Sequence, residues 1–206
     1  YDTDTLLKVE KLFLKLNAVD VFNKSYALQE LELQNGFARI VTEQDGKTNY
    51  QIWKSSKDSS QSSTINLNRV QINNVQVQYT DHKRNIDINT LAEETELKGT
   101  IEKGVFLTQI NGLFQTGDLS VRKENYIRDQ SLSIWLTLEA SKKRANFNGS
   151  VIVDGIALSY EGKVENGYMV NISGKDIAIE KGLSYVPKRY LKPIEGYLLD
   201  GALDFD

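Results

Sequence analysis

Hydrophobic and polar residues alternate along most of the chain. The clearest run places Leu132, Ile134, Leu136 and Leu138 at every second position. A period of two is typical of a β-strand that turns one face toward an apolar environment and the other toward water. The pattern predicts an all-β, mainly antiparallel protein, with its first strand from about Lys8 to Asn17.

Pairs of turn-forming residues interrupt the alternating runs. Such pairs accept a positive φ at low cost, as two-residue hairpin turns require. The pairs are Asn35-Gly36, Asp45-Gly46, Asn73-Asn74, Asn111-Gly112, Asp154-Gly155 and Asn166-Gly167. They predict an extended, curved meander of hairpins that forms a groove or a partly closed sheet.

The register of three hairpins follows from keeping apolar residues on one face. A two-residue turn at Asn73-Asn74 places Val70, Ile72, Val75, Val77 and Tyr79 on one face. A turn at Asp154-Gly155 does the same for Val151, Val153, Ile156, Leu158 and Tyr160. A three-residue loop over 165–167 adds Tyr168, Val170 and Ile172 to that face. This last loop predicts a left-handed backbone at Gly167.

A further hairpin is predicted at Asn35-Gly36, with Glu32 opposite Arg39 on the outer side. The chain is expected to form one β-rich domain over 1–206 and to be a fragment of a longer protein. Residues 54–64 predict a flexible loop, and 19–24 a single helical turn. A short helix is expected near 181–192, limited by Pro187 or by Pro193.

Composition excludes several classes of function. The 206 residues include 25 Lys+Arg and 28 Asp+Glu, which gives a net charge of -3. No basic stripe stands out, so a nucleic-acid partner is not predicted. The chain has no cysteine, which excludes disulfides and thiolate metal sites.

Catalytic signals are weak. The single histidine, His82, is interpreted as a solvated loop residue, although Asp81 precedes it. Residues 93–96 contain three glutamates and are interpreted as a solvated turn. Asp200, Asp204 and Asp206 are interpreted as the outer face of a strand. The prediction is a non-catalytic protein without a metal site or cofactor.

Three stretches resemble the AsmA-like family. Residues 9–16 and 28–33, closing on 45–50, are similar to the family's "strand, short turn, strand, then D-G-x-x-N-aromatic" run. Residues 67–88 resemble its "V-x-I-x-N-x-x-V-x-Y-x-D" hairpin, with Asp81 at the Asp position. Residues 183–187, followed by two glycines, resemble its "L-x-x-x-P" helix. The chain departs from the pattern at Tyr50, where many relatives have Trp.

The resemblance implies a Gram-negative envelope protein that takes part in outer-membrane biogenesis. It implies a periplasmic β part and an inner-membrane anchor that lies outside this sequence. It also implies kinship with chorein-type bridge proteins, whose curved sheets hold acyl chains in a groove. The expected partner is therefore a phospholipid or another acyl lipid.

The predicted lipid-groove residues are Val70, Ile72, Val75, Val77, Tyr79, Val151, Val153, Ile156, Leu158, Tyr160, Tyr168, Val170 and Ile172. Three alternatives stay open from the sequence, one of which is a β-rich glycan-active enzyme. The sheet could close into a sandwich or barrel and bury this face on itself. The chain could instead be a structural or assembly module that binds an envelope protein through its sheet edges.

Overall fold

The computed structural model describes residues 5–16, 26–49, 65–102, 104–141, 143–165, 167–186 and 188–206. The predicted loop over 54–64 and the predicted helical turn over 19–24 lie outside the described residues. So do Asn166 and Pro187.

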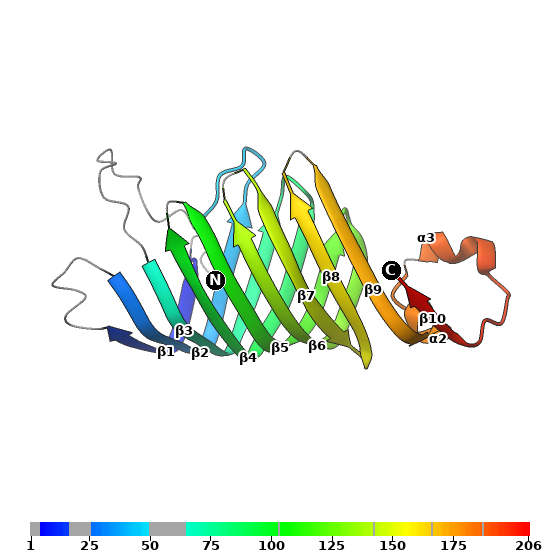
Figure 1. Ribbon diagram of the computed structural model, residues 1–206, viewed down its shortest axis with the longest axis horizontal. Coiled ribbons are helices and arrows are strands. Elements are labelled where there is room, and N and C mark those ends of the chain that lie inside the picture. The colour runs from blue at the N-terminus through cyan, green and yellow to red at the C-terminus, as the bar shows by residue number, and fades with distance from the viewer. Residues whose placement is uncertain are drawn as a thin grey trace.

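One ten-stranded sheet forms almost the whole structure, which confirms the all-β prediction (Figure 1). Its strands are β1 (Leu7–Leu16), β2 (Tyr26–Thr42), β3 (Ile65–Asp81), β4 (Ile86–Glu102), β5 (Val105–Val121), β6 (Glu124–Ala140), β7 (Ala145–Val153), β8 (Ile156–Val164), β9 (Tyr168–Ala178) and β10 (Ala202–Phe205). Their order in the sheet is their order in the chain, and the sheet is not closed. Every pair is antiparallel except β2 and β3, which are parallel. The open sheet decides against a barrel.

The five long strands, β2 to β6, bend along the lower edge of the view in Figure 1. Paired residues form a row across the sheet at this bend: Gly36, Val75, Ala92, Phe114, Leu132 and Val153. Val75 and Ala92 are each only 1% exposed. Because side chains crowd on the inside of a bend, the face that carries this row is the inner face.

Three predicted hairpin turns are wrong. Asn35-Gly36, Asn73-Asn74 and Asn111-Gly112 lie inside the continuous strands β2, β3 and β5, so Glu32 does not pair with Arg39. Asn35 and Asn74 have φ values of 50° and 56° within their strands, and the pairing of β2, β3 and β4 continues across them without a register shift. A single left-handed residue shifts the alternation by one residue, and so does a two-residue turn. Both therefore leave the flanking apolar residues on one face.

The glycine of the third pair is required by close packing between strands. Gly112 is paired with Thr95 on β4. A Cβ at Gly112 would lie only 2.8 Å from the Thr95 Cα atom. The Asn111-Gly112 pair was interpreted as a turn, but its glycine is needed because two strands approach each other closely.

The hairpin between β7 and β8 is confirmed. Asp154 and Gly155 have φ values of 48° and 75°, and Val153 pairs with Ile156. The loop after β8 has the predicted register, since Val164 pairs with Tyr168. Gly167 does not have the predicted left-handed backbone, so that expectation is wrong. The Glu165 N–H donates to the Gly167 carbonyl oxygen at 3.0 Å. This hydrogen bond closes the loop without a left-handed residue at 167.

The predicted carboxyl-terminal helix near 181–192 is present as short helices, and the other described residues contain no helix. The short helices are α2 (Ile179–Leu183), α3 (Lys188–Leu191) and the 3-10 helix η1 (Lys192–Ile194). Lys181 Nζ lies 3.3 Å from Asp154 Oδ2, which fixes α2 beside the β7–β8 turn. Tyr185 packs there against the core cluster of Leu132, Val153, Ile156 and Ile177.

Candidate functional site

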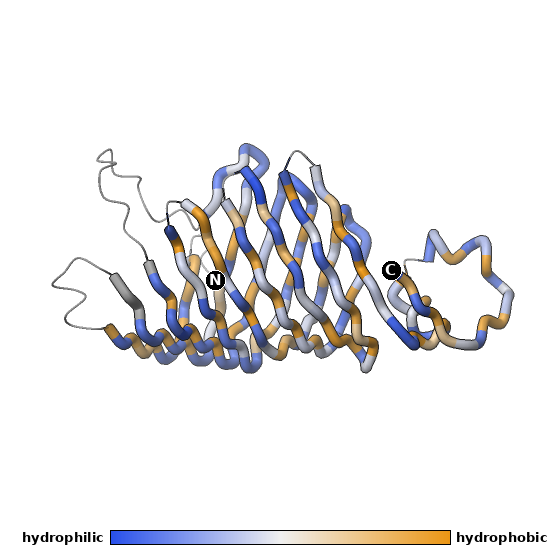
Figure 2. The backbone as a smooth tube through the Cα atoms, viewed as in Figure 1, coloured by the Kyte–Doolittle hydropathy of each residue, from blue (hydrophilic) through white to orange (hydrophobic). Residues whose placement is uncertain are grey.

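The inner face of the sheet is the candidate site. Figure 2 shows apolar and polar segments alternating along the strands, so that one face collects the apolar side chains. All thirteen residues predicted from the sequence lie on this face: Val70, Ile72, Val75, Val77, Tyr79, Val151, Val153, Ile156, Leu158, Tyr160, Tyr168, Val170 and Ile172. The two groups thus share one face, although β4, β5 and β6 lie between β3 and β7.

The face is deeply buried in one region and exposed in another. Val70, Val75, Val153 and Ile156 are buried near the bend. Tyr168 on β9 is 80% exposed, and Val170 and Ile172 are each 47% exposed. The exposed group lies where β9 has β8 on one side and, before Gly174, no strand on the other.

Sequence reasoning missed the middle of this face. Ala92 on β4 and Phe114 on β5 sit in the bend row between β3 and β6. Phe114 packs against the core cluster. The alternate spacing of Ile110, Gly112 and Phe114 indicated that Phe114 lies on the apolar face. Gly112, however, was interpreted as part of a turn.

Four threonines form the polar part of the inner face on β4 and β5. The hydroxyls of Thr90 and Thr116 lie 3.1 Å apart, and the Thr108 hydroxyl donates to the Lys98 carbonyl oxygen at 2.9 Å. Thr95 Oγ1 is buried and has no hydrogen-bond partner among the described residues. None of the four threonines carries a charge, so the middle of the inner face remains largely apolar.

Aromatic side chains cover glycines on β7 and β8. Tyr160 pairs with Gly149, and Phe147 pairs with Gly162. The Tyr160 hydroxyl donates to the Trp135 carbonyl oxygen at 3.1 Å across the glycine. Burial raises the pKa of Tyr160 above its usual value. The rings of Phe147 and Tyr160 add apolar surface to the face. The Tyr160 hydroxyl, their one polar atom, is hydrogen-bonded.

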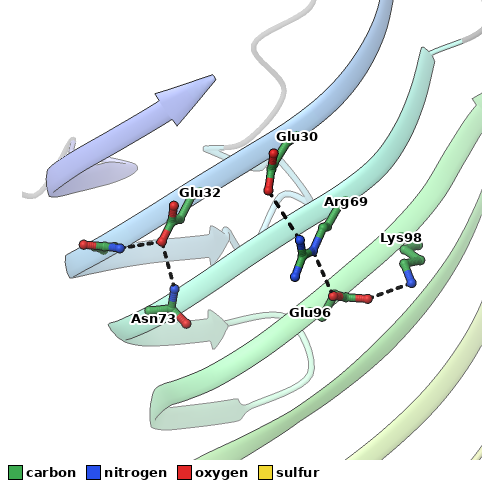
Figure 3. A network of polar contacts seen from close by, with 7 residues as sticks. Glu30, Glu32, Arg69, Asn73, Glu96 and Lys98 are labelled. Atoms are coloured by element: carbon green, nitrogen blue, oxygen red, sulfur yellow. Dashed lines mark hydrogen bonds and ion pairs between the residues drawn. The ribbon is translucent and has the colours of Figure 1, made fainter. Parts of the chain in front are cut away.

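On β2, β3 and β4 the outer face carries a ladder of polar contacts (Figure 3). Arg69 on β3 bridges two strands, with Nε 3.1 Å from Glu96 Oε2 and Nη1 3.5 Å from Glu30 Oε1. Lys98 Nζ lies 2.7 Å from Glu96 Oε1. The hydrogen bond from Lys98, with a further one from Arg69, lowers the pKa of Glu96. The outer face is therefore polar over β2 to β4, whereas Leu113, Trp135 and Ile152 on β5 to β7 are 46%, 45% and 48% exposed on it.

The carboxylate and histidine positions do not assemble a reaction centre among the described residues. His82 lies in the turn between β3 and β4, as predicted. The expectation of a solvated turn at 93–96 is wrong, because these residues lie inside β4 at a bulge. Asp204 is on β10, whereas Asp200 precedes that strand. The described residues contain no group of three or more His, Asp or Glu placed to hold a metal ion.

Asp81 has a structural role. Its carboxylate is fully buried and accepts hydrogen bonds from the Arg84 backbone N–H at 2.8 Å and from Arg84 Nη1 at 2.7 Å. Burial alone would raise the pKa of Asp81, but the hydrogen bonds and charge of Arg84 outweigh it and lower the pKa. Asp81 thus holds the β3–β4 turn.

One cavity lies away from the thirteen predicted residues. It has a volume of about 860 Å³ and is lined by the carboxyl-terminal helices and the segment after them. No helix in the described part of the chain is long and apolar enough to cross a membrane. No family model, curated protein or solved structure matches this chain.

Proposed function

We propose that this chain is a non-catalytic lipid-binding or lipid-transfer module whose inner face holds acyl chains. The observation that carries the proposal is the continuous apolar inner face, which is still 47% to 80% exposed at Tyr168, Val170 and Ile172 on β9. Contiguous exposed apolar surface is unusual in proteins that have no ligand or partner for it. The proposed partner is a phospholipid or another acyl lipid.

The binding energy would come from desolvation. Each methylene group moved from water onto the face contributes about 0.8 kcal/mol. An acyl chain lies flat across several strands and needs no directional bonds, which suits a face built from Val, Ile and Leu. The outer face, which is polar over β2 to β4, keeps the module in contact with water.

The cellular setting is proposed from the sequence resemblance to the AsmA-like family. In that setting the module belongs to outer-membrane biogenesis, faces the periplasm and is anchored to the inner membrane. The open, curved sheet built from sequential strands is consistent with such a module.

A second candidate is an assembly module that binds an envelope protein through a sheet edge. It is favoured by the unpaired edge of β9 over residues 168–173, where Tyr168 and Met169 are 80% and 64% exposed. An edge of this kind accepts another strand by backbone hydrogen bonding.

Native mass spectrometry after gentle purification separates the two candidates. Lipid retained by the wild-type chain supports the first, and a lipid-free chain bound to a protein partner supports the second. Ile172→Asp and Asn171→Asp are the matched variants, because these neighbours are both exposed on β9 but lie on opposite faces. The lipid proposal predicts that only Ile172→Asp loses the lipid. Equal retention by both variants would contradict it.

A further inference from the structure

The β5–β6 turn has a backbone that its residues disfavour. Arg122 and Lys123 have φ values of 52° and 67°, close to the 48° and 75° of Asp154 and Gly155 in the β7–β8 turn. Two-residue turns of this type favour Asn, Asp and Gly. The other non-glycine residues with a positive φ in the described chain are Asn35, Asn74, Asn85, Asp129, Asp154 and Asp176. Among the described non-glycine residues with a positive φ, only Arg122 and Lys123 are long cations.

The turn stands at one end of the inner face. Val121, just before it, pairs with Ile86 on β4, and both lie on that face. The Arg122 N–H donates to the Asn85 carbonyl oxygen at 2.7 Å, so the β3–β4 turn lies beside it. That neighbouring turn adds Lys83 to the same end.

These cations are available for a ligand. The acid that flanks each turn already has a partner: Asp81 binds Arg84, and Glu124 binds Arg189 at 2.9 Å. Lys83, Arg122 and Lys123 form no ion pair with any described residue, and all three are exposed.

The opposite end of the strands differs. There Arg144 pairs with Glu139 at 3.2 Å, and Lys163 lies 4.0 Å from Glu165. Lys143, also at that end, forms no ion pair with a described residue, so the strained backbone of Arg122 and Lys123 is what distinguishes the β5–β6 end.

We propose that Arg122, Lys123 and Lys83 bind the phosphate of an anionic amphiphile whose acyl chains lie on the inner face. The inference rests on the proposed function and specifies its ligand class and orientation. Strained backbone that persists in a fold often marks a functional position. Arg and Lys are the residues that bind phosphate oxygens by charge-assisted hydrogen bonds. Here the phosphate stays in water while the chains reach the apolar face.

The double variant Arg122→Asn/Lys123→Gly tests this directly, because it removes both charges and installs the residues that the turn favours. The urea midpoint should stay the same or rise, so misfolding cannot account for lost binding. Affinity for fluorescent phosphatidylglycerol should fall about tenfold, which corresponds to 1.4 kcal/mol. Affinity for a diacylglycerol with the same chains should not change. Lys143→Gln, at the opposite end, is the control and should bind both lipids normally.

The outcomes separate the inference from the proposed function. If the wild-type chain binds neither lipid, both are overturned. If it binds both lipids and the double variant keeps its affinity for phosphatidylglycerol, the headgroup inference is overturned while the lipid face stands. If soluble glycerol phosphate binds as tightly as the lipid, the site takes free phosphate and the inference is likewise overturned. Selective loss of phosphatidylglycerol binding supports it.

Discussion

The bend and the β9 edge show how one pattern of apolar residues serves two purposes. Val75 at the bend and Ile172 on β9 are both β-branched residues of the inner face, but they are 1% and 47% exposed. At the bend, Val75 has a paired strand on each side, with Gly36 on β2 and Ala92 on β4 as its neighbours. On β9, residue 172 has a neighbouring strand on one side only.

From this difference we expect the residues at the bend to stabilise the fold and the exposed residues on β9 to contact the ligand. A side chain that is already buried gains nothing further from an acyl chain, whereas a half-exposed one still has surface to remove from water. Substitutions at the two places should therefore separate folding from binding.

The largest expected effect is at the bend. Val75→Asp should lower the free energy of unfolding by about 4 kcal/mol or more, because a carboxylate would be buried without a partner. Urea denaturation followed by circular dichroism measures this. A loss below about 1 kcal/mol would mean that the bend is not closely packed.

The next largest loss of stability is expected at a closely packed glycine. Gly149→Ala should cost about 2 kcal/mol, because its Cβ would collide with the Trp135 carbonyl oxygen and lie 2.7 Å from the Tyr160 hydroxyl. Gly167→Ala is the control, since nothing lies within 4 Å of that Cβ. The urea midpoints of the two variants should differ clearly. Similar midpoints would contradict the close approach of β7 to its neighbours.

Asp81 gives an effect that depends on pH. Its pKa is lower in the folded chain than the ordinary value of 3.8, so its stabilising contribution is present above pH 3.8 and is lost as the pH falls toward the folded-state pKa. Asp81→Asn should cost about 1–3 kcal/mol at pH 7. The difference between wild type and variant should shrink below pH 3.8. A difference that is constant with pH would show that the charge of Asp81 is not what matters.

The smallest expected effect is on β9. Ile172→Asp and Asn171→Asp should each change the free energy of unfolding by no more than about 0.5 kcal/mol, because both positions are exposed. Thermal unfolding of the purified variants checks this. A large loss for Ile172→Asp would place the residue in the core and remove the contrast with the bend.

The sequence predicted the face of each strand better than the path of the chain. Asn73-Asn74 and Asp154-Gly155 look alike in the sequence, but the first lies inside β3, where Asn74 is left-handed, and the second is a turn. Which one forms depends on pairing with β2 and β4, which are distant in sequence. The predicted inner-face residues were unaffected, because one left-handed residue and a two-residue turn shift the alternation equally.

Other features had no local signal. The parallel pairing of β2 with β3 places Leu31 beside Val70, and nothing in either segment specifies the direction of its neighbour. The burial of Asp81 depends on the Arg84 contacts within its turn and could not be inferred from alternation. The positive φ values at Arg122 and Lys123 run against turn preferences, so only the structure reveals them.

The central claim is that the inner face contacts acyl chains. Because the chain has no cysteine, single cysteines at positions 168 to 173 can each carry an environment-sensitive fluorophore without interference. On addition of phospholipid, the account predicts a blue shift at 168, 170 and 172 and none at 169 and 171. A uniform response along β9, or a response only at 169 and 171, would contradict it.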